Sequence, residues 1–328
     1  MNMPFGGETR KGGLSQLSAM PRPLRGIIPP LITPLLDSNT LDGAATVNMV
    51  ERLISAEVSG IFVLGTTGEA QALSDQVRSE LVQLVCSTAA GRVPVLVGIG
   101  DTAVEQSIRF ACEAQAAGAS AAVLTAPYYF PLSQEELLRY ISSVARRISL
   151  PVYLYNIPSL TKTAFDPETV CAAAQIPNIY GLKDSSGDME YLAEVVAALR
   201  GRPDFSILCG PEECLAEAIR LGAHGGIAGG SNLWPELYIH LYQAASAGKE
   251  ADVHRLQTII LDISKSIYHR RPEHSSYLRG LKCALAAMGY CRNVMTEPFE
   301  PFTGDEAEVV RAALAQCGLQ SAQEPELR

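Results

Sequence analysis

Lys183 is the residue of this sequence whose type and position best suit covalent chemistry. It ends a short apolar run over residues 179–183, whereas Lys162 lies in a loop, and the chain has only six lysines against 20 arginines. Lysine can lose a proton and attack a carbonyl carbon to form an imine, but arginine stays protonated and cannot do so. We therefore predict that Lys183 forms a Schiff base. From position alone, the alternative is a structural lysine that pairs with a nearby carboxylate.

Tyr155 and two threonines end other apolar runs. Tyr155 ends the run over residues 152–155, and its hydroxyl could move protons beside an imine, although most aromatic residues at such positions only pack in a core. Thr66 and Thr67 follow the run 61–64 between two glycines. Their hydroxyls and the backbone N–H groups of the turn could bind a carboxylate, and the alternative is a plain turn. The turn lacks the Lys-Ser or Lys-Thr ending of a nucleotide-binding loop.

A metal site and a phosphate site are the two alternatives to this chemistry. All five histidines lie in the final third of the chain, and only His224 borders a predicted strand, so we expect no metal site and no metal-dependent aldolase. The glycine-rich segment 225–231 lies near the last predicted strand, where many barrels bind phosphate, and a phosphate site there stays an open alternative. Tyr129, two residues before Pro131, either contributes to the site of Lys183 or only fills a loop.

Eight apolar runs indicate the elements that position these residues. The runs start roughly 20 to 35 residues apart, the length of one strand with its crossover helix, so we predict an α/β fold, a (β/α)8 TIM barrel. An open doubly wound sheet is the competing arrangement. The runs are Ile27–Ile32, Ile61–Leu64, Val95–Val97, Ala121–Leu124, Val152–Tyr155, Ile179–Lys183, Phe205–Leu208 and Gly225–Ala228.

The alternation of side chains along a strand predicts which residues share a face. Lys183 should point the same way as Gly181 and Ile179, and we expect the glycine to leave space for a bound molecule. The same rule groups Tyr153 with Tyr155, and Phe62 with Leu64 and Thr66. In such a barrel the residues at the C-terminal ends of the strands converge on one cavity.

Helix signals complete the domain prediction. Ser74 begins a helix over 74–90, and Ser133 with Glu136 forms a capping box that begins a helix over 133–147. After residue 248 only helices are predicted, over 252–270, 275–289 and 304–317. The predicted organisation is a poorly ordered extension at 1–24, the barrel at 25–248 and a C-terminal helical domain at 249–328.

Composition narrows the class of protein. With 26 basic against 35 acidic residues the net charge is −9, so we expect neither nucleic acid nor anionic membranes as partners. The eight cysteines include no C-x-x-C pair, and the N-terminus has no apolar leader, which together favour a reducing cytoplasm. No sufficiently long apolar stretch predicts a membrane span.

The chain resembles the dihydrodipicolinate synthase / N-acetylneuraminate lyase family over about residues 25–318. The resemblance rests on five motifs that occur in family order and spacing: GTTGE at 65–69, PYYFPLSQEEL at 127–137, YNIPS at 155–159, GLKDSSGD at 181–188 and GGIAGGSN at 225–232. It implies a homotetramer, a dimer of dimers, of barrels with a C-terminal helical domain. It also implies a Schiff base with pyruvate or another 2-keto acid, without metal or pyridoxal phosphate.

The resemblance also implies residue roles. Lys183 matches the Schiff-base lysine, Tyr155 the tyrosine that relays protons, Thr66 and Thr67 the pair that binds the 2-keto carboxylate, and Tyr129 a tyrosine supplied to a neighbouring subunit's site. Further substrate contacts are expected from Gly65, Leu160, Ser185, Ala228 and Gly229, in or beside the same motifs, and from the acidic pair Glu212 and Glu213.

Departures from the family pattern concern the second half of the substrate. Leu160 stands where the synthase has an arginine for the carboxylate of aspartate semialdehyde. Glu212 and Glu213 are similar to an acidic pair that binds sugar hydroxyls in the sialic acid lyase, but Gly229 replaces a serine of that lyase. The sequence therefore favours a lyase acting on a 2-keto-3-deoxy sugar acid or a sialic-acid-like substrate. The alternatives are dihydrodipicolinate synthase, a deoxy-sugar-acid dehydratase and a barrel that binds a 2-keto acid without turnover.

Overall fold

Eight parallel strands form a closed barrel in the computed structural model, which describes residues 20–319. The strands follow one another around the sheet in the order β1-β10-β9-β8-β7-β6-β5-β4, and the bridge between Pro30 and Phe62 joins the β1 segment to β4. The predicted (β/α)8 barrel is confirmed, and the open sheet is wrong because the two ends of this sheet meet. The strands are β1 (Gly26–Ile27), β4 (Ile61–Val63), β5 (Val95–Gly98), β6 (Ala121–Thr125), β7 (Val152–Asn156), β8 (Ile179–Asp184), β9 (Ser206–Cys209) and β10 (Gly225–Gly226).

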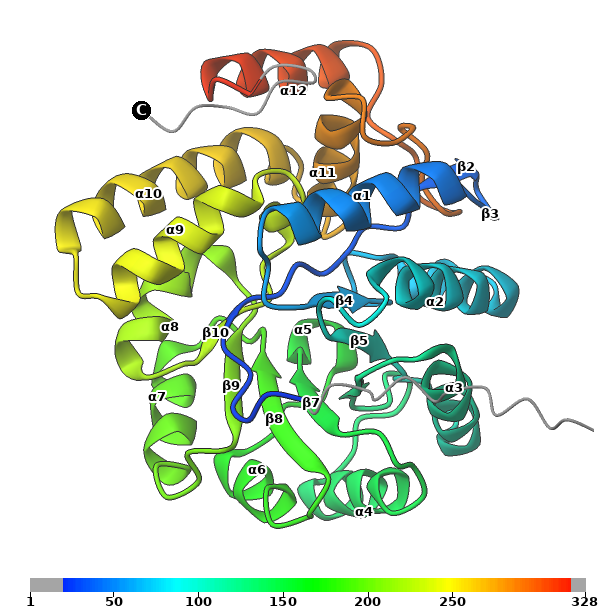
Figure 1. Ribbon diagram of the computed structural model, residues 1–328, viewed down its shortest axis with the longest axis vertical. Helices are drawn as coiled ribbons and strands as arrows, with labels where there is room; N and C mark the ends of the chain where they lie inside the picture. Colours follow the sequence, from blue (N-terminus) through cyan, green and yellow to red (C-terminus); the bar gives the residue numbers. More distant parts are fainter. Residues whose placement is uncertain (1–19, 320–328) are drawn as a thin grey trace, which may run out of the picture.

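Helices surround the strands (Figure 1). Ser74 and Ser133 cap α2 and α4 as predicted, and the full capping box with Glu136 is present. The helices that follow the strands are α1 (Gly43–Ser55), α2 (Asp75–Ala89), α3 (Val104–Ala117), α4 (Gln134–Ala145), α5 (Pro158–Thr161), α6 (Pro167–Ala173), α7 (Met189–Ala198), α8 (Leu215–Leu221) and α9 (Pro235–Ser246). A short antiparallel hairpin of β2 (Leu35–Asp37) and β3 (Thr40–Leu41), which the sequence did not indicate, precedes α1.

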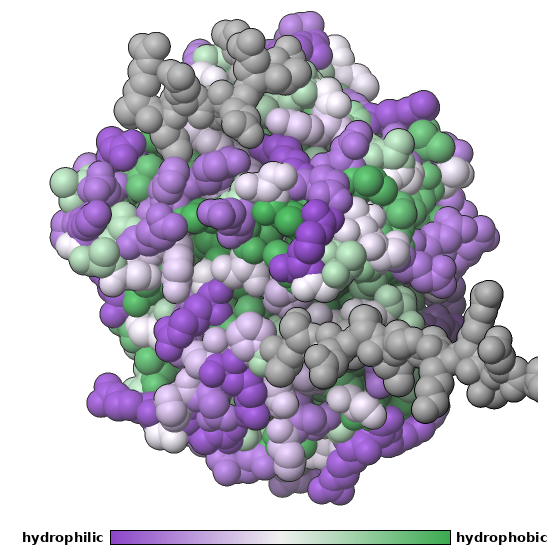
Figure 2. Space-filling model, viewed as in Figure 1, coloured by the Kyte–Doolittle hydropathy of each residue, from purple (hydrophilic) through white to green (hydrophobic). Residues whose placement is uncertain are grey.

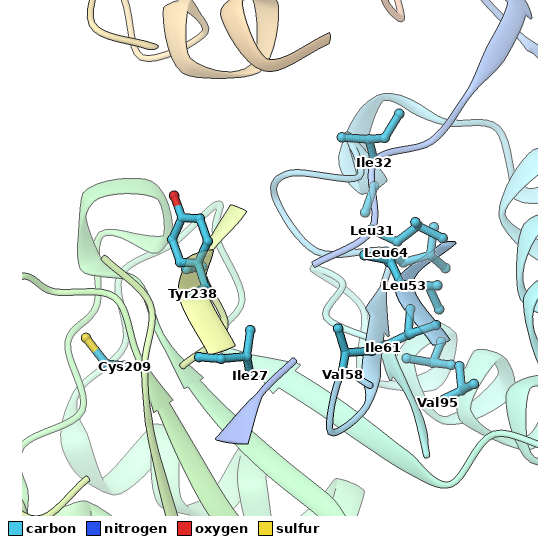
Figure 3. Close-up of a cluster of buried hydrophobic side chains, with 14 of the residues drawn as sticks. Ile27, Leu31, Ile32, Leu53, Val58, Ile61, Leu64, Val95, Cys209 and Tyr238 are labelled. Carbon is cyan, nitrogen blue, oxygen red and sulfur yellow. The ribbon is translucent and has the colours of Figure 1, made fainter. Parts of the chain in front are cut away.

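The core has two layers. The larger layer lies between the strands and the helices, and Figure 3 shows Leu53 of α1 gathered there with Ile61 of β4 and Val95 of β5. The smaller layer fills the barrel itself. Its buried members are Leu24, Ile28, Phe62, Leu96, Ala121, Val123, Tyr153, Tyr155, Ile157, Leu208 and Ile227.

The predicted alternation is wrong at the start of β8. Val152 pairs with Ile179, but Tyr153 pairs with Gly181, so Tyr180 is one residue too many, as in a β-bulge. Ile179 consequently packs in the outer layer, while Gly181 faces the interior. Because of the extra residue, the side chain at the start of β8 faces the side opposite to the one predicted. The end of the strand, from Gly181 to Lys183, keeps the predicted alternation.

The predicted common face of Phe62 and Leu64 is also wrong. Phe62 lies inside the barrel, whereas Leu64 packs in the outer layer. Leu64 has a left-handed backbone with φ of 59°, which ends the alternation just after β4.

Residues 20–24 cover the floor of the barrel, at the N-terminal ends of the strands. Leu24 is buried in the inner layer, its backbone N–H donates to Ser206 Oγ at 2.9 Å, and Met20 packs against the same layer. The Arg22 guanidinium lies over the Tyr180 ring. Residues 20–24, which were predicted as part of a poorly ordered extension, therefore pack against the barrel. Residues 1–19 of the predicted extension lie outside the described residues.

A group of helices follows α9, as the sequence predicted. It contains α10 (Glu250–Ile263), a π-helical turn at Ser264–Tyr268, α11 (Ser276–Ala287) and α12 (Asp305–Gln316), and Figure 1 shows α11 and α12 at one end of the molecule. Within residues 20–319, no helix has the length and apolar character needed to cross a membrane. Hydrophilic residues are spread over the face seen in Figure 2, with hydrophobic residues between them.

Candidate active site

Lys183 and Tyr155 lie side by side on neighbouring strands, near the C-terminal end of the barrel. They are register partners in β8 and β7, and each side chain is buried. The Nζ atom of Lys183 is 4.0 Å from the centroid of the Tyr155 ring and 5.0 Å from that of Phe62. The amine is thus held against aromatic rings, away from bulk water.

Tyr155 joins the lysine to the turn after β4. Its hydroxyl lies 3.4 Å from Oγ1 of Thr66. Burial acts to raise the pKa of the Tyr155 phenol, but the charge of Lys183 and hydrogen bonds with Thr66, Lys183 and Ser185 together lower this pKa below its ordinary value. A phenol whose pKa is lowered in this way suits proton transfer beside the amine.

Thr67 contacts a residue that the sequence analysis did not single out. Its Oγ1 lies 3.1 Å from the hydroxyl of Tyr277, the second residue of α11. The segment 275–289 was predicted as a helix, without a residue of the site in it. No local signal marks Tyr277, because only the folded chain brings α11 to the barrel mouth.

Glu69, the last residue of the GTTGE motif, is also held by the C-terminal helices. Its carboxylate accepts hydrogen bonds from the backbone N–H and the hydroxyl of Thr296, at 2.9 and 2.7 Å, and lies 2.6 Å from Nζ of Lys282. Neither Glu69 nor Lys282 was predicted as a site residue. The sequence signal is the single acidic residue at the end of the otherwise uncharged GTTGE motif. If that acid is buried it needs a buried cation as its partner.

Glu212 and Glu213 follow β9 and differ in environment. Glu212 is buried, and its two carboxylate oxygens accept hydrogen bonds from the Tyr238 hydroxyl at 2.7 Å and the Gly230 N–H at 2.8 Å. Burial, followed by the charge of Glu213, raises the pKa of Glu212 to about 8. Glu213 is more exposed and accepts a hydrogen bond from Ser264 Oγ.

The glycine-rich segment 225–231, which includes β10, was the alternative phosphate site. Within it, the backbone N–H of Gly230 is not free to bind a phosphate. The Gly230 N–H already donates to the Glu212 carboxylate. Ala228 is fully buried, and Gly229 lines the cavity beside Tyr277. An ideal Cβ at Gly229 would lie 1.3 Å from the Tyr277 hydroxyl, so the absence of a side chain there makes room for the phenol.

Most of the predicted site residues line one cavity of about 950 Å³ at the barrel mouth. This volume is at the upper end of the usual range for small-molecule pockets, so it leaves room for a substrate longer than pyruvate. The predicted residues in its wall are Gly65, Thr66, Thr67, Tyr155, Leu160, Lys183, Ser185, Glu212, Glu213 and Gly229. Among residues 20–319 no three histidine, cysteine or acidic side chains are grouped to hold a metal.

Two predicted residues lie elsewhere. Ala228 is absent from the cavity wall, and so is Tyr129, which is 70% exposed and packs edge-on against Phe130. Tyr128, its neighbour, does line the cavity. The expectation that Gly181 leaves space for a ligand is wrong, because an added Cβ would meet the Tyr153 ring at 2.7 Å. Gly181 serves the packing of the barrel interior.

The fold and the relatives of this chain define a lyase of the class I aldolase type. The model of the dihydrodipicolinate synthetase family matches residues 23–317. The chain belongs to this family, as the motifs indicated.

Three similar proteins show how broad the relationship is. A solved structure of dihydrodipicolinate synthase from Bacteroides thetaiotaomicron is 45% identical, with a TM-score of 0.88, and the match covers 90% of this chain and all of that one. A prophage protein of this family from Escherichia coli K12, solved in complex with pyruvate, is 31% identical, with a TM-score of 0.84 and coverage of 90% and 99%. A probable 2-dehydro-3-deoxy-D-pentonate aldolase of the same organism is 34% identical, covering 84% of this chain and 92% of its own.

Proposed function

We propose that Lys183 forms a Schiff base with the 2-keto group of a 2-keto-3-deoxy sugar acid or a sialic-acid-like substrate, and that the protein cleaves or forms the bond between C3 and C4. The observation that carries the proposal is the buried Lys183 amine in register with Tyr155, whose hydroxyl reaches Thr66. The similarity to a pentonate aldolase supports the sugar-acid class, and the similarity to a protein solved with pyruvate supports a site for a 2-keto acid.

In the cleavage direction, the amine attacks the keto carbon, and Tyr155 gives its proton to the departing hydroxide, so that water leaves and a protonated imine faces a tyrosinate. The Tyr155 tyrosinate then takes the proton of the C4 hydroxyl, the C3–C4 bond breaks, and the electron pair of that bond passes into the imine to form an enamine while an aldehyde is released. Tyr155 returns this proton to C3 of the enamine. Water then hydrolyses the imine, which frees pyruvate and regenerates the lysine. The lowered pKa of Tyr155 suits this proton transfer.

The remaining residues are assigned to substrate binding. Thr66 and Thr67, with backbone N–H groups of the turn that Gly65 begins, bind the 2-keto carboxylate, and Ser185 lines the cavity beside Tyr155. Farther from the lysine, the acidic pair after β9 meets substrate hydroxyls, and Glu213 has the freer carboxylate. Ala228 is buried outside the cavity wall, so it supports the neighbouring Gly229 rather than contacting the substrate directly.

Leu160 favours the sugar-acid reaction over dihydrodipicolinate synthesis. Its side chain is 41% exposed and lines the cavity, so it offers an apolar wall where a second carboxylate would need a cation. A dehydratase of deoxy sugar acids would use the same lysine and differs only in releasing water.

A trapping experiment tests the lysine. The protein is incubated with pyruvate and reduced with borohydride, and the adduct is located by peptide mapping. We expect the adduct on Lys183, its loss in Lys183→Arg, and its retention in Lys162→Arg, where the same change is made at an exposed loop lysine. An adduct that survives in Lys183→Arg would contradict the proposal.

A substrate panel then separates the branches. Sialic acid, 2-keto-3-deoxy sugar acids, and pyruvate with aspartate semialdehyde are supplied in parallel, and pyruvate, aldehyde and dehydrated products are measured. Aldehyde release from a sugar acid supports the proposed reaction. Turnover of the semialdehyde alone supports the synthase, and an adduct without turnover of any substrate supports a binding protein.

We further propose a homotetramer, a dimer of dimers, working in the cytoplasm without metal or pyridoxal phosphate. Tyr129 supports the assembly, because an aromatic side chain that is 70% exposed and adjoins Phe130, at 71%, suits contact with a neighbouring subunit. Light scattering after size-exclusion chromatography tests this, with Tyr129→Ser and Phe130→Ser expected to shift the mass toward smaller species.

A further inference from the structure

Helix α11 touches the carboxylate-binding turn at two points. Tyr277 near its beginning reaches Thr67 at 3.1 Å, and Lys282 farther along reaches Glu69 at 2.6 Å. Both partners belong to the segment 65–69. The C-terminal helices are therefore joined to the very turn whose hydroxyls face the proposed 2-keto acid.

The Tyr277 phenol is fixed in place from several sides. Its ring packs edge-on against Tyr268, with centroids 5.4 Å apart, and its hydroxyl occupies the space that a side chain at Gly229 would take. Thr67 is the hydrogen-bond partner of this hydroxyl within the described residues. The phenol therefore has a single defined direction, toward Thr67.

The direction of the hydrogen bond between Tyr277 and Thr67 decides whether Thr67 can also donate to a substrate. A threonine hydroxyl has one proton to donate, and a carboxylate can only accept. If Thr67 donated to Tyr277, it would have no proton left for the substrate. If Tyr277 donates to Thr67, the Thr67 proton is free to point into the cavity, and a chain of hydrogen bonds strengthens each member.

We propose that Tyr277 is a positioning residue for the 2-keto carboxylate: it donates to Thr67 and so orients the Thr67 hydroxyl as a donor to the substrate. This inference rests on the proposed function, because it requires a carboxylate beside Thr67. Burial raises the pKa of the Tyr277 phenol, so the hydroxyl keeps the proton that it donates. Helix α11 thus completes a binding site whose other members come from the barrel.

The test measures the pyruvate concentration that gives half-maximal borohydride-trapped adduct. In Tyr277→Phe we expect this concentration to rise about five- to tenfold, the effect of losing one hydrogen bond, with the maximal amount of adduct unchanged at saturating pyruvate. Tyr140→Phe is the matched control, because it removes the same atom from a buried phenol of α4 outside the cavity. It should leave the curve unchanged.

Repeating the Tyr277→Phe substitution in a Thr67→Val variant separates positioning of the hydroxyl from a general packing effect. Thr67→Val removes the hydroxyl that Tyr277 orients, so adding Tyr277→Phe to Thr67→Val should raise the half-maximal concentration little further. A full five- to tenfold rise in that background overturns the inference, and so does an unchanged curve for Tyr277→Phe alone.

A steric variant carries the test should Tyr277→Phe fail to fold. Gly229→Ala introduces a Cβ only 1.3 Å from the Tyr277 hydroxyl and must displace it, so it should raise the half-maximal pyruvate concentration in the same direction. An unchanged concentration in Gly229→Ala overturns the inference. If the unmodified protein forms no adduct, the proposed function fails and this inference fails with it. That outcome is distinguishable from failure of the inference alone, because the inference is tested by the variants and the proposed function by the unmodified protein.

Discussion

Nζ of Lys282 lies 2.6 Å from Oε1 of Glu69, and both side chains are 1% exposed. These residues are far apart in the chain, one in the turn after β4 and the other in α11. Thr296 adds two hydrogen bonds to the same carboxylate. The pair therefore fixes the C-terminal helices to the barrel at the edge of the active site.

Breaking this pair should destabilise the fold. Lys282→Met leaves the buried Glu69 carboxylate without its cation, and loss of one partner from a buried pair typically costs about 3–5 kcal/mol of unfolding free energy. Denaturant unfolding at fixed protein concentration measures the change. The double variant Glu69→Gln/Lys282→Met should recover part of the loss, and a double variant less stable than both singles would contradict this account.

The exposed pair of Arg147 and Glu105 provides a matched control for that prediction. Its nitrogen and oxygen are also 2.6 Å apart, but the two side chains are 44% and 74% exposed. Solvent screens exposed pairs, so Arg147→Met should change the unfolding free energy little.

Glu212 should make stability depend on pH. Burial and then Glu213 raise its pKa from 4.5 to about 8. Between these values the unfolded chain has released a proton that the folded chain keeps, so the contribution of this group is fully present below about pH 4.5 and is lost as pH rises to about 8. Glu212→Gln cannot ionise, and the stability of this variant relative to the unmodified protein should therefore increase through that window. Denaturant unfolding at several pH values measures it, and Glu217→Gln, at an exposed position of α8, should show no such trend.

Tyr155→Phe should separate imine formation from turnover. The variant keeps the ring beside Lys183 but lacks the hydroxyl that moves the proton, and loss of general acid–base catalysis typically costs about 10²–10⁴-fold in rate. We expect a pyruvate adduct at saturating pyruvate together with a fall in kcat of at least about 100-fold. Unchanged kcat on a sugar acid would remove Tyr155 from the mechanism.

Leu160→Arg should move the substrate preference. A guanidinium at this wall of the cavity can pair with a second carboxylate in two parallel hydrogen bonds. Relative to the unmodified protein, kcat/KM should rise for aspartate semialdehyde with pyruvate and fall for an uncharged sugar chain. Leu160→Gln, which is long and polar but uncharged, should not reproduce the rise; if it does, charge is not the determinant.

The sequence predicted the repeating part of the fold well, for physical reasons. Buried parallel strands need continuous apolar runs, and helices need caps such as Ser74 and Ser133, so both leave local signals. The placement of Lys183 beside Tyr155 followed from their positions near the ends of two neighbouring strands. Their roles in catalysis remain predictions that the trapping and turnover experiments test.

Other features depend on contacts that no local pattern encodes. The extra residue at Tyr180 reverses the alternation of β8 only at its start, and a bulge of this kind depends on the neighbouring strand. Gly181 was predicted to face a ligand but faces the ring of Tyr153. Tyr277 and Lys282 are ordinary helix residues until α11 packs on the barrel.

The packing at the N-terminal end of the barrel limits how reactants enter and products leave. Leu24 lies in the inner layer, and the Arg22 guanidinium covers the Tyr180 ring, so the N-terminal end of the barrel is plugged. Within the described residues, the cavity at the opposite end of the barrel is then the route for both reactants and products, and the proposed sugar acid enters it with the keto-acid end first. In the proposed cleavage the aldehyde fragment lies between pyruvate and the opening of the cavity, so the aldehyde leaves first and pyruvate follows.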